Sequence, residues 1–218
     1  MTHIYISSIH EYKALKDIEL VTKARRERIQ RYLRDEDKAR CLLAGLLLRK
    51  SCGVTDDCQL TYGENDKPYL KNSDTHFNIS HSGDYVVLAT ADREVGVDIE
   101  KVIPYSDEAA VCRSKAARCF TQQELDWMRQ EGFRIGSDEA FYRLWTAKES
   151  VMKASGLGFS LAPDTFCVLP LDSSAHHIAD NLWFLNWLSY DGHIICCAVK
   201  DKIQEAKLII MNPGDLRY

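Results

Sequence analysis

Two carboxylates, Asp98 and Glu100, lie two residues apart near the middle of the chain. Side chains at this spacing on a β-strand share a face, so a strand here sets them side by side while Val97 and Ile99 face a core. Adjacent carboxylates repel unless a cation, a proton or a basic side chain lies between them. Their oxygen atoms suit a hard divalent cation such as magnesium. Taken alone, the pair also fits the solvated face of an amphipathic strand.

A later helix carries charged groups of complementary chemistry. Apolar periodicity predicts a helix over residues 137–154, which includes Lys148, Glu149 and Lys153. The last two, four residues apart, could form only a surface ion pair. However, Trp145 shares a face with Glu149, which indicates that this carboxylate turns toward the core and could meet the two strand carboxylates. A position of Glu149 on the far side of the molecule would exclude a shared metal site.

A basic helix is the candidate for phosphate binding. Residues 20–50 show helical periodicity and are rich in lysine and arginine. Arg25 and Arg28 are neighbours on a helix surface, and Arg40 follows later in the same stretch. Acidic residues interrupt the series, so a solvated helix with internal ion pairs is the alternative interpretation.

Polar residues in the connecting segments have two interpretations each. Lys67 lies in a segment rich in turn signals, and Ser80 and His81 belong to a polar cluster before a strand. A histidine beside hydroxyl groups in a loop suits ligand binding as well as a structural role. Thr121 and Glu124 fit a capping box, although Glu124 could also help to position water or metal.

These groups must be positioned by strands and helices in both parts of the chain. Strands at residues 85–91 and 95–102 are expected to form an antiparallel hairpin. A boundary near residue 104 divides the chain into halves 1–103 and 104–218. A helix is predicted over residues 109–119, and His176-His177 in a surface turn. One small antiparallel sheet is predicted for the tail, with strands at residues 166–169, 183–188, 193–199 and 207–211.

Composition excludes several classes of protein. The 218 residues are 45% hydrophobic and 28% charged, which suits a folded protein with a sizeable core. The net charge of −4 argues against a nucleic-acid binder. No run approaches the roughly 20 apolar residues that span a bilayer, and the first residues lack a signal peptide's apolar run. Eight scattered cysteines without C-x-x-C favour reduced thiols and a cytoplasmic protein.

The motifs, in order, resemble those of the Sfp-type 4′-phosphopantetheinyl transferases. They are K-P-x-L from residue 67, F-N-I-S-H-S-G at 77–83, G-V-D-I-E at 96–100, F-x-x-x-E at 120–124 and W-x-x-K-E-S-x-x-K at 145–153. Each alone is unspecific, whereas five in this order are specific. Three departures are arginine for the common lysine at residues 25 and 28, Asp66 for a glycine, and Cys41 for a hydroxyl residue.

The resemblance implies an α+β, sandwich-like fold of two similar halves in a pseudo-twofold arrangement, with coenzyme A in the cleft between them. It implies transfer of 4′-phosphopantetheine from coenzyme A to a serine of an apo acyl, peptidyl or aryl carrier protein, with release of adenosine 3′,5′-bisphosphate. Magnesium is the implied cofactor and a monomer the expected state. The alternatives are another magnesium-dependent phosphotransferase, or a non-catalytic module that binds coenzyme A or carrier proteins.

The family pattern also implies roles for individual residues. The metal ligands would be Asp98, Glu100 and Glu149. Lys153 would contact the pyrophosphate, with Lys148 in the same site. The nucleotide would be bound by Arg25, Arg28, Arg40, Lys67, Ser80 and His81. The serine nucleophile needs a base, and we expect Glu149 to accept its proton, directly or through a metal-bound water. Glu124 is a secondary candidate for helping to position water or metal.

Overall fold

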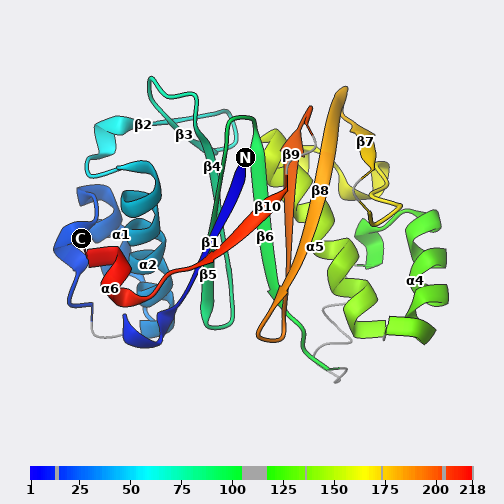
Figure 1. Cartoon of the computed structure of the whole chain (residues 1–218), viewed down its shortest axis with the longest axis horizontal. Coiled ribbons are helices and arrows are strands. Elements are labelled where there is room, and N and C mark those ends of the chain that lie inside the picture. The colour runs from blue at the N-terminus through cyan, green and yellow to red at the C-terminus, as the bar shows by residue number, and fades with distance from the viewer. Residues whose placement is uncertain (13–14, 105–116, 136, 173, 203–204, 218) are drawn as a thin grey trace.

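The first sheet joins strands from distant parts of the chain. Its order is β10-β1-β5-β4, with β1 (Thr2–Ser8), β4 (His76–Ser82), β5 (Tyr85–Ala91) and β10 (Ala206–Ile210) (Figure 1). β10 runs parallel to β1, and the other pairs are antiparallel. The strand predicted near residue 207 therefore exists, but its assignment to the tail's own sheet is wrong.

The second sheet has the order β6-β9-β8-β7, with β6 (Val95–Lys101), β7 (Ala175–Ile178), β8 (Asn181–Tyr190) and β9 (His193–Lys200). All its pairs are antiparallel. The predicted hairpin of β5 with β6 is wrong, because β5 already pairs with β1 and β4 on its two edges. The short turn after β5 carries the chain from one sheet to the other.

Two further expectations for the tail are corrected. Residues 166–169, all within the described part of the chain, form no strand, and the Phe166 carbonyl oxygen and the Val168 nitrogen instead bond to the side chains of Lys148 and Glu124. His176 and His177 lie in β7 rather than in a turn, and the side chain of His176 is buried.

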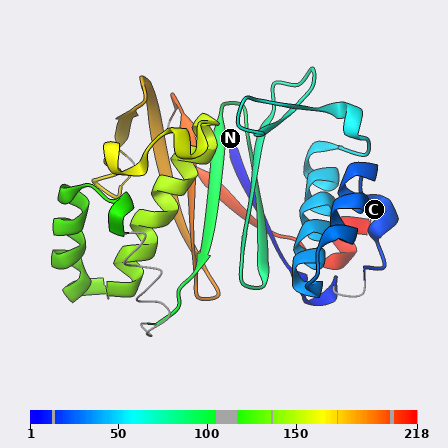
Figure 2. The ribbon, with the colours of Figure 1, turned by 180° about the vertical axis from the view of Figure 1, so that it is seen from behind.

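Helices cover the outer face of each sheet. α2 (Asp35–Cys52) lies against the first sheet and α5 (Ser137–Ser155) against the second (Figures 1 and 2). α1 (Lys23–Arg31) packs on α2, and α4 (Gln122–Ile135) packs on α5. The short helix α6 (Pro213–Arg217) packs near α2. Among the described helices, none is both long and apolar enough to cross a bilayer. The order of layers is therefore helix, sheet, sheet, helix.

The structure is a computed structural model, and it describes residues 1–12, 15–104, 117–135, 137–172, 174–202 and 205–217. Residues 109–116 of the helix predicted over 109–119, and the chain directly after the predicted boundary at residue 104, lie outside these residues. β2 (Leu60–Tyr62) and β3 (Pro68–Leu70) form a separate two-stranded sheet. Short 3-10 helices lie at Ile9–Glu11, Ile18–Leu20, Asp57–Gln59, Ala117–Cys119, Gly158–Ser160 and Pro163–Thr165.

The two sheets pack against each other through a shared apolar core. Aliphatic residues of both sheets, among them Ile4, Val87, Val97 and Ile195, pack in one buried cluster. β6 thus belongs with the later strands and β10 with the earlier ones. The division into sheets does not coincide with the predicted division of the chain at residues 103 and 104.

Candidate active site

The two central carboxylates of β6 face away from the core between the sheets, as the alternation of the strand predicts. Asp98 is almost fully buried, with 3% of its surface exposed. Its Oδ1 accepts hydrogen bonds from Ser80 Oγ at 2.8 Å and from Lys153 Nζ at 2.5 Å. Two residues further along β6, Glu100 Oε2 accepts a hydrogen bond from Ser82 Oγ at 2.8 Å. β4 thus supplies a hydroxyl group to each carboxylate.

Glycine at position 96 allows α5 to lie directly on β6. A Cβ atom there would be 2.1 Å from the Ser150 carbonyl oxygen and 2.4 Å from the Ala154 nitrogen. No side chain fits these distances, so the residue type is required by the close approach. Because α5 approaches this closely, Lys153 can reach Asp98. The G-V-D-I-E motif carried this signal, but the sequence analysis assigned no role to its glycine.

Lys153 links the strand carboxylates to the helix. Its Nζ lies 2.5 Å from Asp98 Oδ1 and 3.9 Å from Glu149 Oε2. Glu149 therefore lies on the same side of α5 as the strand carboxylates. Among the described residues, no three histidine, cysteine or acidic side chains are arranged to hold a metal ion. One polar atom is left over: Asp98 Oδ2 is buried and has no hydrogen-bond partner in the part of the chain described.

Burial and mutual repulsion shift the proton affinity of this cluster. Burial, followed by the charge of Asp98, raises the pKa of Glu100 to about 7. Burial also raises the pKa of Glu149. For Lys153 burial acts to lower the pKa, but attraction to Asp98 and the hydrogen bond to it outweigh burial and raise the pKa. The ammonium is thus held in its charged form, and the carboxylates of Glu100 and Glu149 bind protons more readily than free ones.

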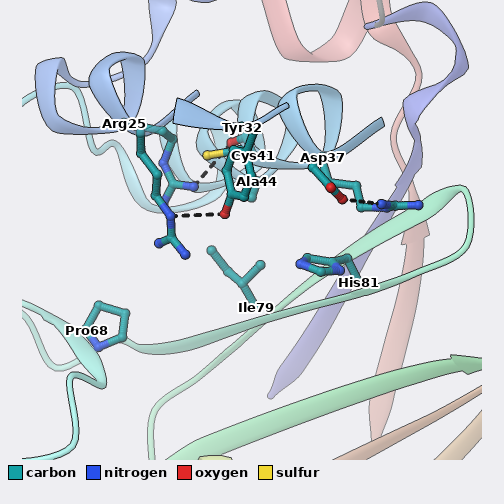
Figure 3. Close-up of a pocket in the computed structure, with 10 residues that line it drawn as sticks. Arg25, Tyr32, Asp37, Cys41, Ala44, Pro68, Ile79 and His81 are labelled. Atoms are coloured by element: carbon teal, nitrogen blue, oxygen red, sulfur yellow. Dashed lines mark hydrogen bonds and ion pairs between the residues drawn. The ribbon is translucent and has the colours of Figure 1, made fainter. Parts of the chain in front are cut away.

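A basic pocket of about 390 Å³ lies between α2 and β4 (Figure 3). Arg25 and Arg28 reach it from α1, Arg40 from α2 and His81 from β4. These four residues, which the sequence analysis assigned to the nucleotide, are therefore brought together. Cys41 also lines the pocket.

The arginines of the pocket are anchored but retain donor capacity. Arg25 Nη1 donates to the Cys41 carbonyl oxygen at 3.2 Å, and Arg28 Nε donates to Tyr32 Oη at 3.2 Å. Arg40 donates to the Gly83 carbonyl oxygen. Since a guanidinium has five N–H donors, these bonds leave donors that can bind an anion.

The positive charge of the pocket comes from its arginine side chains and not from His81. Burial, followed by the charges of Arg40 and Lys153, lowers the pKa of His81. Asp37 is the acidic lining residue, and it is paired with Arg40, with Oδ1 2.7 Å from Nη1. An anion in the pocket would therefore meet the guanidinium groups and a neutral imidazole that can donate or accept a hydrogen bond.

Lys67 and Ser80 lie elsewhere than the basic pocket. Lys67 Nζ donates to the carbonyl oxygens of Val95 at 3.2 Å and Ala154 at 2.6 Å, and burial lowers the pKa of this ammonium to about 8. It fastens the segment before β3 to β6 and to the end of α5. Ser80, next to His81 on β4, points to the opposite face and belongs with Asp98.

Lys148 and Glu124 are separate from the carboxylate cluster. Both side chains are fully buried, with Lys148 Nζ 2.8 Å from Glu124 Oε2. The same ammonium donates to the carbonyl oxygens of Pro163 and Phe166, each at 2.6 Å. Glu124 Oε2 also accepts from the Thr121 nitrogen at 2.8 Å, which confirms the capping box. The contacts of this pair are with α4 and the segment after α5.

Comparison with known families agrees with the division into two sheets. Residues 94–199 match the 4′-phosphopantetheinyl transferase superfamily, and residues 8–93 match a family described as 4′-phosphopantetheinyl transferase, N-terminal. The two matches meet at the turn between β5 and β6. The chain is 33% identical over 198 residues to a 4′-phosphopantetheinyl transferase of Bacillus subtilis, covering 87% of this chain and 81% of that protein.

Other relatives carry related names. The chain is 34% identical over 154 residues to the 4′-phosphopantetheinyl transferase Sfp of Bacillus subtilis strain 168, covering 68% of this chain and 66% of that protein. It is 33% identical over 163 residues to an L-aminoadipate-semialdehyde dehydrogenase-phosphopantetheinyl transferase of Xenopus laevis, covering 67% and 53%. The chain therefore belongs to the 4′-phosphopantetheinyl transferase superfamily, whose members transfer phosphopantetheine from coenzyme A to carrier proteins. The enzyme class predicted from the order of the motifs is confirmed.

Proposed function

We propose that the chain moves the 4′-phosphopantetheine arm of coenzyme A to a serine of an apo acyl or peptidyl carrier protein, with magnesium bound at the carboxylate cluster. One observation carries this proposal. Ser80 and His81 are adjacent on β4 and point to opposite faces, one toward Asp98 and the other into the basic pocket. A basic pocket and an acidic cluster are therefore joined by two adjacent residues of one strand, which supports a substrate that carries both a terminal phosphate and a pyrophosphate.

The basic pocket suits the 3′-phosphate of coenzyme A. Arg25, Arg28 and Arg40 approach it from different directions, and guanidinium groups bind phosphate through paired, charge-assisted hydrogen bonds. His81 adds one more polar contact. We propose that this pocket holds the nucleotide end, so that the pyrophosphate lies toward the cluster around Asp98.

The carboxylate cluster suits a magnesium ion. Its donors are carboxylate oxygens, and the buried Asp98 Oδ2 lacks a partner among the described residues. Burial holds the pKa values of Glu100 and Glu149 above their usual range, a cost that a bound cation would remove. Magnesium, when bound, would neutralise charge on the pyrophosphate and polarise the reacting phosphoryl group. We propose Asp98, Glu100 and Glu149 as the residues that would hold it.

The transfer step needs a proton acceptor and stabilisation of the leaving group. We propose that Glu149 accepts the proton of the carrier serine, since burial raises its pKa toward that of an effective base. A bond then forms between the serine oxygen and the β-phosphorus of coenzyme A, and the bond to the bridging pyrophosphate oxygen breaks. Lys153, held in its charged form, would stabilise the negative charge on the departing adenosine 3′,5′-bisphosphate.

The remaining predicted site residues would act through position. Lys67 joins β6 to the end of α5, and Lys148 with Glu124 joins α5 to α4. We propose that these contacts keep Glu149 and Lys153 in register with β6. The pseudo-twofold relation of two halves, a monomeric state and a cytoplasmic location stay predictions.

Intact-mass spectrometry tests the function. A panel of apo carrier proteins is incubated with coenzyme A, magnesium and the enzyme, and we expect at least one carrier to gain the mass of one phosphopantetheine. Glu149→Gln should abolish this gain while coenzyme A binding stays measurable by calorimetry. The matched variant Glu131→Gln alters an exposed ion pair on α4 and should transfer normally. If no carrier gains the mass, the proposed function is contradicted. If Glu149→Gln transfers normally, the assignment of Glu149 as the base is wrong.

A further inference from the structure

Lys153 lies among oxygen atoms contributed by three different elements. Its Nζ is 2.5 Å from Asp98 Oδ1 on β6, 3.1 Å from Ser80 Oγ on β4 and 3.9 Å from Glu149 Oε2 on α5. Ser80 in turn donates to the same Asp98 oxygen at 2.8 Å. An ammonium with several oxygen neighbours resembles a coordinated metal ion, because it is positively charged and contacts oxygen atoms. It carries one positive charge, whereas magnesium carries two.

We infer that Lys153 serves as an internal cation, which neutralises the carboxylates before substrate binds and must leave them before a magnesium ion can be fully coordinated. This inference rests on the proposed function. Magnesium and coenzyme A would then bind cooperatively, since the pyrophosphate offers the ammonium new anionic partners and releases Asp98 and Glu149 to the metal.

The arrangement of the cluster supports this order of events. The ammonium engages Asp98 Oδ1 and Glu149, and no three acidic, histidine or cysteine side chains within the described residues are set to hold a metal. The buried Asp98 Oδ2 is left as a point of first attachment. An ammonium and a divalent cation at neighbouring positions repel, so the second can be held well only when the first moves.

Lysine is suited to such a displacement. Its charge sits at the end of a flexible four-carbon stem, so the ammonium can move by rotation about side-chain bonds without movement of the helix. The Lys153 side chain is 29% exposed, so it is not enclosed on all sides. Gly96 holds the backbone of α5 against β6 throughout, so that Glu149 stays beside the strand carboxylates.

Calorimetric titration with magnesium chloride, in the absence of coenzyme A, tests the inference. Lys153→Met should bind magnesium about tenfold more tightly than the wild type, because the competing cation is gone. Lys101→Met removes the same charge from an exposed side chain next to Glu100 and is the matched control. It should change magnesium affinity by less than about threefold, as expected for a screened surface charge. In the wild type, coenzyme A should strengthen magnesium binding, and in Lys153→Met this gain should be smaller.

Several outcomes overturn the inference. Magnesium binding by Lys153→Met that is no tighter than by the wild type, or no tighter than by Lys101→Met, shows that the ammonium does not compete. That outcome leaves the proposed metal site intact, because magnesium would still be seen to bind. If no form binds magnesium with or without coenzyme A, the proposed metal site fails as well, and the two failures are thereby distinguished.

A measurement on the wild type covers the case that Lys153→Met does not fold. The ammonium resonance of Lys153 in proton–nitrogen correlation spectra is assigned by its loss in Lys153→Arg. We expect little change with magnesium alone at low concentration and a clear shift when magnesium and coenzyme A are both present. A resonance that stays unchanged at saturation with both ligands overturns the displacement.

Discussion

Lys148 and Glu124 form an ion pair with 2.8 Å between Nζ and Oε2, and neither side chain has any exposed surface. The pair joins α5, which carries Lys148, to the first turn of α4, which carries Glu124. It also satisfies the carbonyl oxygens of Pro163 and Phe166. A buried charge whose partner is removed is costly, because water cannot replace that partner. Loss of either partner should therefore lower the stability of the protein, and any effect on transfer should follow from this loss of stability.

Lys148→Met is expected to lower the free energy of unfolding by about 3 kcal/mol, since it leaves the Glu124 carboxylate buried and unpaired. Urea denaturation followed by circular dichroism measures this. The control is Arg129→Met, which removes an exposed partner of Asp126 and should cost less than about 1 kcal/mol. Equal effects of the two substitutions would show that the buried pair contributes no more than a surface one.

Gly96→Ala is expected to destabilise the protein by about 2 kcal/mol or more, because its methyl group would overlap the backbone of α5 at Ser150. The shift of α5 should also weaken transfer, since it separates Lys153 from Asp98. Thermal denaturation and the mass assay measure the two effects. Gly214→Ala adds the same methyl group where no atom lies within 4 Å and should leave both unchanged. A Gly96→Ala protein of normal stability would contradict the packing argument.

Arg28→Ala should raise the Kd for coenzyme A by about tenfold, through loss of a charge-assisted contact to the 3′-phosphate. The affinity for dephospho-coenzyme A, which lacks that phosphate, should change far less. Calorimetry with both ligands gives the comparison. Arg31 lies on the same helix, is exposed and is absent from the residues that line the pocket, so Arg31→Ala is the control. An equal loss of affinity for both ligands would place the 3′-phosphate elsewhere.

The raised pKa of Glu100, about 7 against a usual 4.5, gives a stability that depends on pH. The folded state holds this proton more tightly than the unfolded state does. The resulting stabilisation is fully present below about pH 4.5 and is lost as the pH rises through about 7. Chemical denaturation in EDTA should therefore show that Glu100→Gln gains stability relative to the wild type between pH 5 and pH 8. A difference between the two proteins that is constant with pH contradicts this origin.

The faces of individual strands could be predicted from the sequence, whereas the sheet topology could not, for physical reasons. Alternation along 95–101 correctly placed both carboxylates on one face, because period-2 geometry is local. The hairpin of β5 with β6 was wrong because a short turn between two buried strands looks the same whether it stays in one sheet or passes to another. Sheet membership depends on partners distant in sequence, such as β9, which no local pattern reveals.

Lys148 was expected in the same site as Lys153, but the two side chains have different contacts. Helical geometry explains this difference. Residues five apart on an α-helix are separated by about 140° around its axis, so the two ammonium groups point to different sides. The spacing within the motif could have separated them. The depth of Lys148 could not have been foreseen, since burial of a lysine depends on the matching carboxylate of Glu124 and on two carbonyl oxygens from a later segment.

The pairing of β10 with β1 has a consequence for synthesis of the chain. β1 is made first and cannot acquire this neighbour until the other strands that the structure describes have been made, because β10 follows all of them in the chain. The first sheet thus stays incomplete until β7, β8 and β9 of the second sheet have been made, with an open edge along β1. Such distant contacts slow folding, since the loop between the partners must be ordered before the pairing is gained. Completion of the first sheet therefore follows synthesis of the second, so the two sheets are expected to form together.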